Sequence, residues 1–101
     1  MASRLELHEV LCKILGSRNV YFQPPASVKM QYPAIVYERS DIQTQYADNN
    51  PYLQSLQYQV TVIDKNPDSE IVTEVSKLPL CRFDRHYTAD NLNHDVFTLY
   101  F

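Results

Sequence analysis

The last twenty residues, 82–101, constrain the fold more than any other segment. They form two runs of alternating apolar and polar residues around a polar turn at 90–93, and this pattern predicts a closing β-hairpin. In the second run, Phe97, Leu99 and Phe101 fall on one face of the strand. We expect this aromatic chain end to be packed in a sheet or against a neighbouring subunit. The segment therefore favours a compact part of an assembly.

Size and charge restrict the class of protein. A chain of 101 residues that is 45% hydrophobic is expected to form one folded domain, residues 1–101. Its apolar runs are too short to span a membrane, and it begins without a secretory signal, so we expect a soluble protein made inside the cell. Net charge is −3, and the basic residues are scattered singly, which disfavours nucleic-acid binding.

Two helices are predicted. Residues 3–15 carry a capping box and an apolar stripe at helical spacing, and Gly16 follows where a left-handed cap is needed. The second helix is expected to begin at the cap Asn66, with Pro67 in its first position, and to end at about Lys77.

Strands account for most of the remaining chain. A short strand is predicted at 20–22 and longer ones at 34–42 and 53–63, whereas residues 43–52 show no periodicity and are expected to form a polar loop. The polar face of the 53–63 strand is amide and hydroxyl, suited equally to water or to another subunit. The element order predicts an α+β fold, with a mainly antiparallel sheet of four to five strands and two helices packed on one face.

Residues with reactive side chains do not form a recognisable chemical motif. Cys12 and Cys81 are interpreted as reduced thiols, because the chain has no C-x-x-C pair. The closing turn would place Ala89 opposite His94 and His86 nearer Phe97, a spacing poorly suited to metal binding. We therefore expect no catalytic residues, no metal site and no cofactor, and the protein is interpreted as a non-enzyme.

Three segments carry a resemblance to a known family. They are the Tyr-Pro-Ala-Ile-Val-Tyr strand at 32–37, the Tyr-Gln-Val-Thr-Val strand at 58–62 leading through 64–68 into a helix, and the hairpin segment 85–93. In these patterns and in element order, the chain resembles the tail terminator, or tail-completion, proteins of long-tailed bacteriophages. The similarity covers most of the chain and rests on strand patterns.

The resemblance implies a structural role at the head–tail junction of the virion, after assembly in the bacterial cytoplasm. Such proteins form a homo-oligomeric ring, typically hexameric, that caps the tail tube and contacts a head-completion or stopper protein. DNA would pass through the lumen of the ring without specific binding. The 43–52 segment would then be the docking element. The expected interface residues are Tyr46, Asn49, Asn50, Tyr52, Gln57 and Gln59.

The sequence is also compatible with other classes of protein. The nearest alternative is another neck protein, such as a head-completion, stopper or minor capsid protein, although a stopper would show more β-barrel character. A small ligand-binding or enzymatic α+β domain would instead need a pocket with convergent polar groups. A nucleic-acid-binding module would show salt-dependent retention of DNA.

Overall fold

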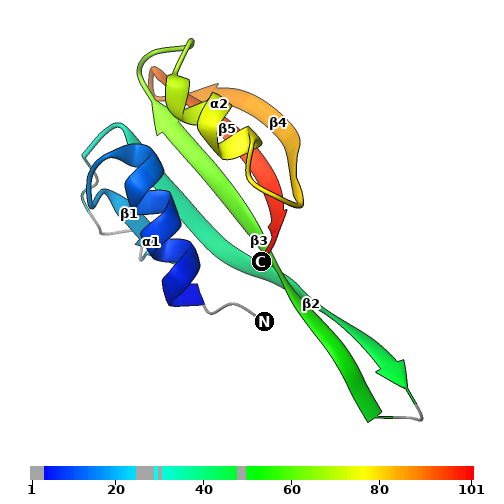
Figure 1. The fold of residues 1–101 in the computed structure, drawn as a ribbon. Coiled ribbons are helices and arrows are strands. Elements are labelled where there is room, and N and C mark those ends of the chain that lie inside the picture. The colour runs from blue at the N-terminus through cyan, green and yellow to red at the C-terminus, as the bar shows by residue number, and fades with distance from the viewer. Residues whose placement is uncertain (1–3, 25–28, 30, 48–49) are drawn as a thin grey trace.

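A computed structural model shows five strands in one sheet, in the order β1-β2-β3-β5-β4 (Figure 1). It describes residues 4–24, 29, 31–47 and 50–101, and for residues 41–47 and 50–55 the backbone alone. All neighbouring strands are antiparallel except β1 and β2, so the predicted α+β fold with a mainly antiparallel sheet is confirmed. The elements are α1 (Arg4–Leu15), β1 (Val20–Phe22), β2 (Ala34–Ala47), β3 (Asn50–Asp64), α2 (Glu70–Ser76), β4 (Cys81–Ala89) and β5 (Leu92–Tyr100).

The first helix follows its sequence pattern closely. Leu7 and Leu11 lie one turn apart on the apolar stripe, and both are fully buried. Gly16 has a φ of 79°, and its N–H donates to the Cys12 carbonyl at 2.9 Å. This left-handed residue ends α1 as predicted, because glycine has no Cβ to oppose a positive φ.

The second helix begins later than predicted. Asn66 does not cap it; its side chain instead accepts a hydrogen bond from the Asp68 N–H at 3.0 Å in a local turn. The N-cap is Ser69, whose hydroxyl accepts from the Ile71 N–H at 3.3 Å. Its C-cap is Lys77, so the predicted end of the helix is confirmed and its start is wrong.

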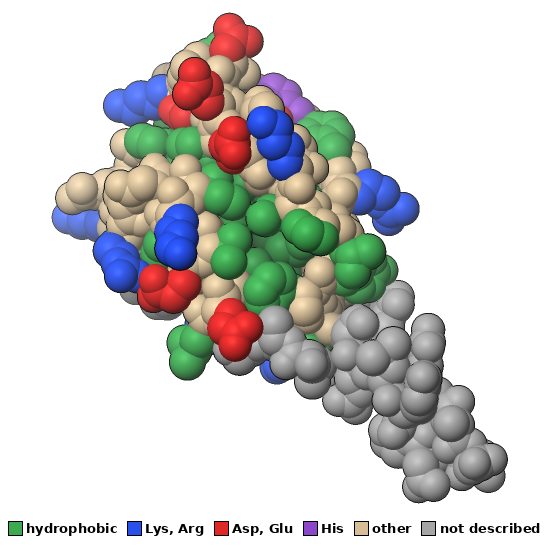
Figure 2. Space-filling model, viewed as in Figure 1, with side chains coloured by type: hydrophobic (Ala, Val, Ile, Leu, Met, Phe, Trp, Pro, Cys, Tyr) green, Lys and Arg blue, Asp and Glu red, His purple; other side chains and the backbone are tan. Residues whose placement is uncertain are grey.

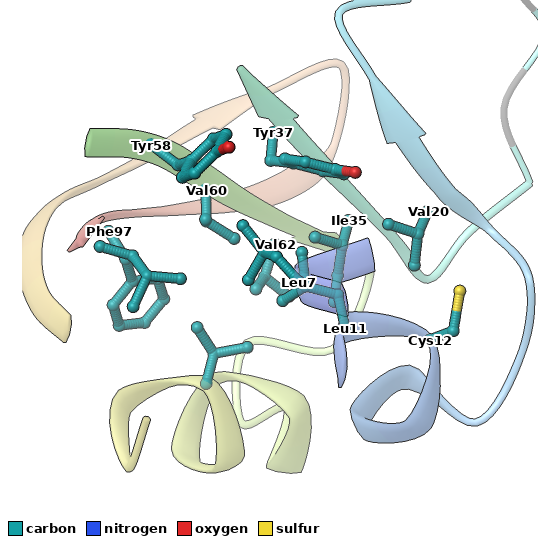
Figure 3. Close-up of a cluster of buried hydrophobic side chains, with 12 residues drawn as sticks. Leu7, Leu11, Cys12, Val20, Ile35, Tyr37, Tyr58, Val60, Val62 and Phe97 are labelled. Carbon is teal, nitrogen blue, oxygen red and sulfur yellow. The ribbon is translucent and has the colours of Figure 1, made fainter. Parts of the chain in front are cut away.

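A single buried cluster joins both helices to the sheet. Side chains from α1 and α2 meet alternate residues of β2, β3 and β5, and both helices lie in front of the sheet in Figure 1. Figure 3 shows Leu7 and Leu11 directed towards Ile35 and Val62. The cluster consists of Leu7, Leu11, Cys12, Val20, Ile35, Tyr37, Tyr58, Val60, Val62, Val75, Phe97 and Leu99.

The predicted loop at 43–52 is not a loop. Strand β2 continues through Ala47 and β3 begins at Asn50, so the two form one long antiparallel hairpin. Figure 1 shows this hairpin extending away from the rest of the molecule. The molecule including the hairpin measures 51 × 26 × 23 Å. The segment lacks an apolar–polar alternation because most of it lies outside the region where one face meets the core.

The closing hairpin is present, with a tighter turn than predicted. Asp90 and Asn91 have φ values of 53° and 62°, which is typical of a two-residue type I′ loop. Ala89 therefore pairs with Leu92, and the expected pairing of Ala89 with His94 is wrong. The N–H of Phe101 donates to the Leu56 carbonyl at 3.0 Å, so the end of the chain is held in the sheet as predicted.

Candidate interaction surfaces

The long hairpin changes character at a β-bulge. Up to Tyr37, strand β2 lies between β1 and β3, and from Gln57 onward β3 lies between β2 and β5. The register shifts between Arg39 and Asp41, and the Ser40 hydroxyl donates to the Gln57 carbonyl at 3.3 Å. Bulges bend a strand and increase its twist, so this one redirects the hairpin where it leaves the five-stranded sheet.

Beyond the bulge the hairpin is a two-stranded ribbon. We call residues 41–47 and 50–55 the arm. Within the described chain, its two strands pair only with each other, so each has an outer row of N–H and C=O groups without a strand neighbour. Isolated two-stranded ribbons are at best marginally stable in water, and open edges readily pair with other strands. The arm is therefore suited to binding along its length.

Three of the predicted interface residues belong to the arm. The register places Tyr46 opposite Pro51 and Asn50 opposite Ala47. Tyr52 lies in β3 beside the irregularity between Gln45 and Tyr46. The structure thus brings Tyr46, Asn50 and Tyr52 together in one ribbon, and no side-chain position is described for them. Asn49 lies outside the described residues.

The other two predicted interface residues lie at the base of the arm and in the main sheet. Gln57 donates from Nε2 to the Tyr100 hydroxyl at 3.1 Å, which fixes its amide against the neighbouring strand. Gln59 pairs with Glu38 on one side and with Thr98 on the other, and it is half-buried. Both glutamines therefore belong to the face of the sheet that is opposite the helices.

Strand β4 forms the other long border of the sheet. It pairs only with β5 among the described strands, and every residue after Cys81 in this strand is exposed. A bulge at Asp84 interrupts its register between Phe83 and Arg85. The strand thus has two straight parts that present an outer row of backbone hydrogen-bonding groups.

The pairing identifies which backbone groups of β4 point outward. The Tyr100 N–H donates to the Leu80 carbonyl at 3.2 Å, so by alternation Cys81 and Phe83 direct their N–H groups away from β5. Past the bulge, Ala89 flanks the two-residue loop and must bond inward, which leaves His86 and Thr88 facing outward. These groups are available to an added strand.

An exposed leucine sits at the start of β4 in a strained conformation. Leu80 has a φ of 58°, in the left-handed region that non-glycine residues avoid, and its side chain is 74% exposed. Both the backbone strain and the exposed apolar surface cost the isolated chain free energy. Leu80 is therefore an exposed apolar side chain on a strained backbone next to the β4 edge.

More apolar surface adjoins Leu80. Phe83 is 52% exposed and touches buried Phe97 edge-on, with ring centroids 5.6 Å apart. Leu78, Cys81 and Phe101 are partly buried hydrophobic residues that pack against the core cluster. In Figure 2, hydrophobic side chains gather between α1 and α2 and continue towards the border of the sheet. This apolar surface lies along the helix side of the β4 edge.

Past the bulge, β4 carries aromatic and titratable groups on both of its faces. Tyr87 stacks on His94, with ring centroids 4.6 Å apart and an interplanar angle of 11°. His86 pairs with Asp95 in the register, in place of the predicted position near Phe97. Burial raises the pKa of the Asp95 carboxyl, although His86 and His94 act in the opposite direction. This group of side chains stiffens the hairpin end next to the exposed edge.

A polar cluster between α1 and the sheet is satisfied internally. The Tyr37 ring is buried, and its hydroxyl accepts from Arg4 Nη1 at 3.2 Å and contacts His8 Nδ1 at 2.8 Å. Arg4 also lies over the Phe22 ring, 4.4 Å from its centroid. Because burial raises the pKa of Tyr37, its hydroxyl stays protonated and can donate to His8. The cluster anchors α1 to β2.

A shallow hollow at the end of α1 contains the exposed Arg18–Glu9 ion pair, with a separation of 2.9 Å, beside Cys12 and Lys13. Cys12 and Cys81 are free, and burial raises the pKa of the Cys81 thiol. In the part of the chain with described side chains, no three acidic, histidine or cysteine residues converge as metal ligands would. None of the described helices is long and apolar enough to cross a membrane.

Comparisons with known proteins add no relatives. The chain matches no protein-family model, and no curated protein matches its sequence.

Sequence reasoning found the arm as a segment of interest and missed the β4 edge. The alternation in 81–89 predicted a strand, but nothing in it indicated a bulge at Asp84 or which border of the sheet β4 would occupy. Leu80 follows Pro79, where a helix is expected to end, and a single leucine at that point carries no signal of positive φ. Edge position depends on strand order, which alternation alone does not determine.

Proposed function

We propose that this protein is a structural, non-enzymatic component of the bacteriophage head–tail junction, and specifically a tail terminator. It would act by forming a homo-oligomeric ring, typically hexameric, on the end of the tail tube. One face of the ring would contact the tube protein, and the other would receive a head-completion or stopper protein. The lumen would let DNA pass without sequence-specific binding.

The observation that carries this proposal is that one small chain has two strand edges, the arm and β4, whose outer backbone groups have no neighbouring strand in the described structure. The arm and β4 each have backbone groups without a strand neighbour in the described structure, and β4 is flanked by the exposed residues Leu80 and Phe83. A protein that functions alone is expected to cover such borders, whereas a subunit of an assembly uses them. The proposal therefore requires binding, and no chemical step.

The shape of the sheet supports a terminator over a stopper. Stoppers are expected to have more β-barrel character and fewer helices, whereas this chain has an open five-stranded sheet with two helices. The net charge of −3 per chain also supports the proposed lumen, because several copies would present a negative ring that repels DNA phosphates.

Electron microscopy of the purified protein tests the proposal. Negative-stain images should show rings with a central hole, and addition of the protein to polymerising tail tube protein should give tubes with a ring at one end. Serum albumin at the same concentration serves as the control for non-specific effects on tube length. Tubes that grow unchanged, without bound rings, would contradict the assignment.

A further inference from the structure

We propose that the arm of one copy pairs, as an added β-strand, with the exposed edge of β4 in the next copy. This inference rests on the proposed function and deepens it by specifying which surfaces form the ring contact. The partner is a second copy of this chain, and the contact is heterologous. Repetition of such a contact closes into a ring if the rotation between copies allows it.

The two surfaces match in length and in backbone chemistry. The 41–47 strand of the arm has seven residues and spans about 23 Å, while the nine residues of β4 span about 30 Å. Both present unpaired main-chain donors and acceptors within the described structure. Pairing would satisfy the outward N–H groups of His86 and Thr88, and it would give the arm the third strand that a ribbon needs for stability.

The composition of the arm also suits this role. Among its thirteen residues only Asp41 is charged, so it can enter a strand interface with little cost from desolvating charges. It contains apolar and aromatic residues at Ile42, Tyr46, Tyr52 and Leu53. Such residues are suited to cover the apolar surface beside β4.

Other ways of using the same edges fit less well. The arm cannot pair with β4 of its own chain, because it extends away from the body on the opposite side of the bulge at Ser40 (Figure 1). A symmetric β4–β4 contact would bring together two bulged strands that each carry a net positive charge, because Asp84 offsets only one of Arg82 and Arg85. Like charges across such a contact oppose pairing. A heterologous contact avoids both problems.

Two complementary variants test the inference. In the shortened variant, Asn-Gly replaces residues 44–54, which joins the register pair Gln43 and Ser55 by a two-residue turn and leaves the β4 edge intact. In the blocked variant, His86→Pro removes an outward N–H from β4 and leaves the arm intact. His86→Ala is the matched control, because it removes the same side chain and keeps the N–H.

The heterologous model predicts a distinctive result by light scattering. Each variant alone should be monomeric, with self-association at least about tenfold weaker than that of the unmodified protein, while His86→Ala should assemble normally. An equimolar mixture of the two variants should give one heterodimer and nothing larger, because the arm of the blocked variant can use the edge of the shortened one. If His86→Pro does not fold by circular dichroism, Thr88→Pro blocks the other outward N–H past the bulge.

Each other outcome overturns a specific part of the model. Dimers of the shortened variant alone would show β4–β4 pairing, and dimers of the blocked variant alone would show arm–arm pairing. A mixture without heterodimer, when the unmodified protein forms rings, would reject this contact and leave the proposed function standing. An unmodified protein that stays monomeric would instead reject the proposed function itself.

Discussion

The two ends of the β2–β3 hairpin are made of the same two strands and lie in different surroundings. At the base, β2 and β3 are central strands, and Tyr37, Tyr58 and Val60 are buried beneath the helices. In the arm, the strands have only each other within the described structure. The comparison shows that the base has its neighbours within the single chain, whereas the arm would gain neighbouring strands only through the assembly proposed above.

The largest expected effect is a loss of stability when the packing of α1 against the base of the hairpin is disturbed. Leu7→Ala should lower the free energy of unfolding by about 2–5 kcal/mol, because it removes a fully buried side chain and leaves a cavity between α1 and the sheet. Leu5→Ala on the same helix is the matched control, since Leu5 is 64% exposed and should cost less than about 0.5 kcal/mol. Urea denaturation measures both. Equal losses would contradict the described packing of α1.

A strained residue beside β4 gives effects of opposite sign on folding and on assembly. Leu80→Gly should raise the free energy of unfolding of the monomer by about 0.5–1 kcal/mol, because glycine accepts the positive φ without strain. It should also weaken self-association, because the exposed apolar side chain is lost. Thermal melts of dilute monomer and light scattering at higher concentration check the two parts. A variant that is less stable and assembles unchanged would reject this role for Leu80.

The arm is expected to contribute little to the stability of the monomer. Replacing residues 44–54 by Asn-Gly should change the free energy of unfolding by less than about 0.5 kcal/mol, because the removed strand pairs lie beyond the five-stranded sheet. The melting temperature should be measured at a concentration where both proteins are monomeric, since assembly itself stabilises the folded state. A large loss of stability would show that the arm belongs to the folding core, against the comparison above.

The smallest expected change in stability comes from Asp95 in the closing hairpin. Because burial raises the pKa of folded Asp95 above its ordinary value of 3.8, its contribution to stability is greatest below that value and is lost as pH rises through the folded-state pKa. Asp95→Asn should therefore raise stability near pH 7, by only about a few tenths of a kcal/mol because the group is largely hydrated. Chemical denaturation at pH 3 and pH 7 should show the gain at pH 7 alone. A gain confined to pH 3 would reverse the assigned sign.

Local sequence signals predicted the body of the protein well. The apolar stripe and Gly16 predicted α1 and its end, and alternation predicted β3 and the closing hairpin. These elements are determined by contacts near in sequence and by one buried face, which periodicity reports directly. The start of α2 was misplaced because the polar residues around Asn66 form local turns before Ser69 caps the helix.

The candidate surfaces were predicted only in part. The 43–52 segment was recognised as unusual, but its strand pairing was missed, since its sequence has no apolar–polar alternation that would indicate a strand. The β4 edge was missed for a different reason: strand order, the bulge at Asp84 and the positive φ of Leu80 arise from the whole fold. Such features appear only once the strands are placed beside one another.

The mass of the unmodified protein in solution tests the central claim most directly. Sedimentation velocity should give a discrete assembly, with a mass that is an integral multiple of the 11.8 kDa chain, and this assembly should dissociate on dilution without unfolding. A single species of 11.8 kDa at every concentration up to the solubility limit would contradict the account, because the arm and the β4 edge would then have no partner in a second copy.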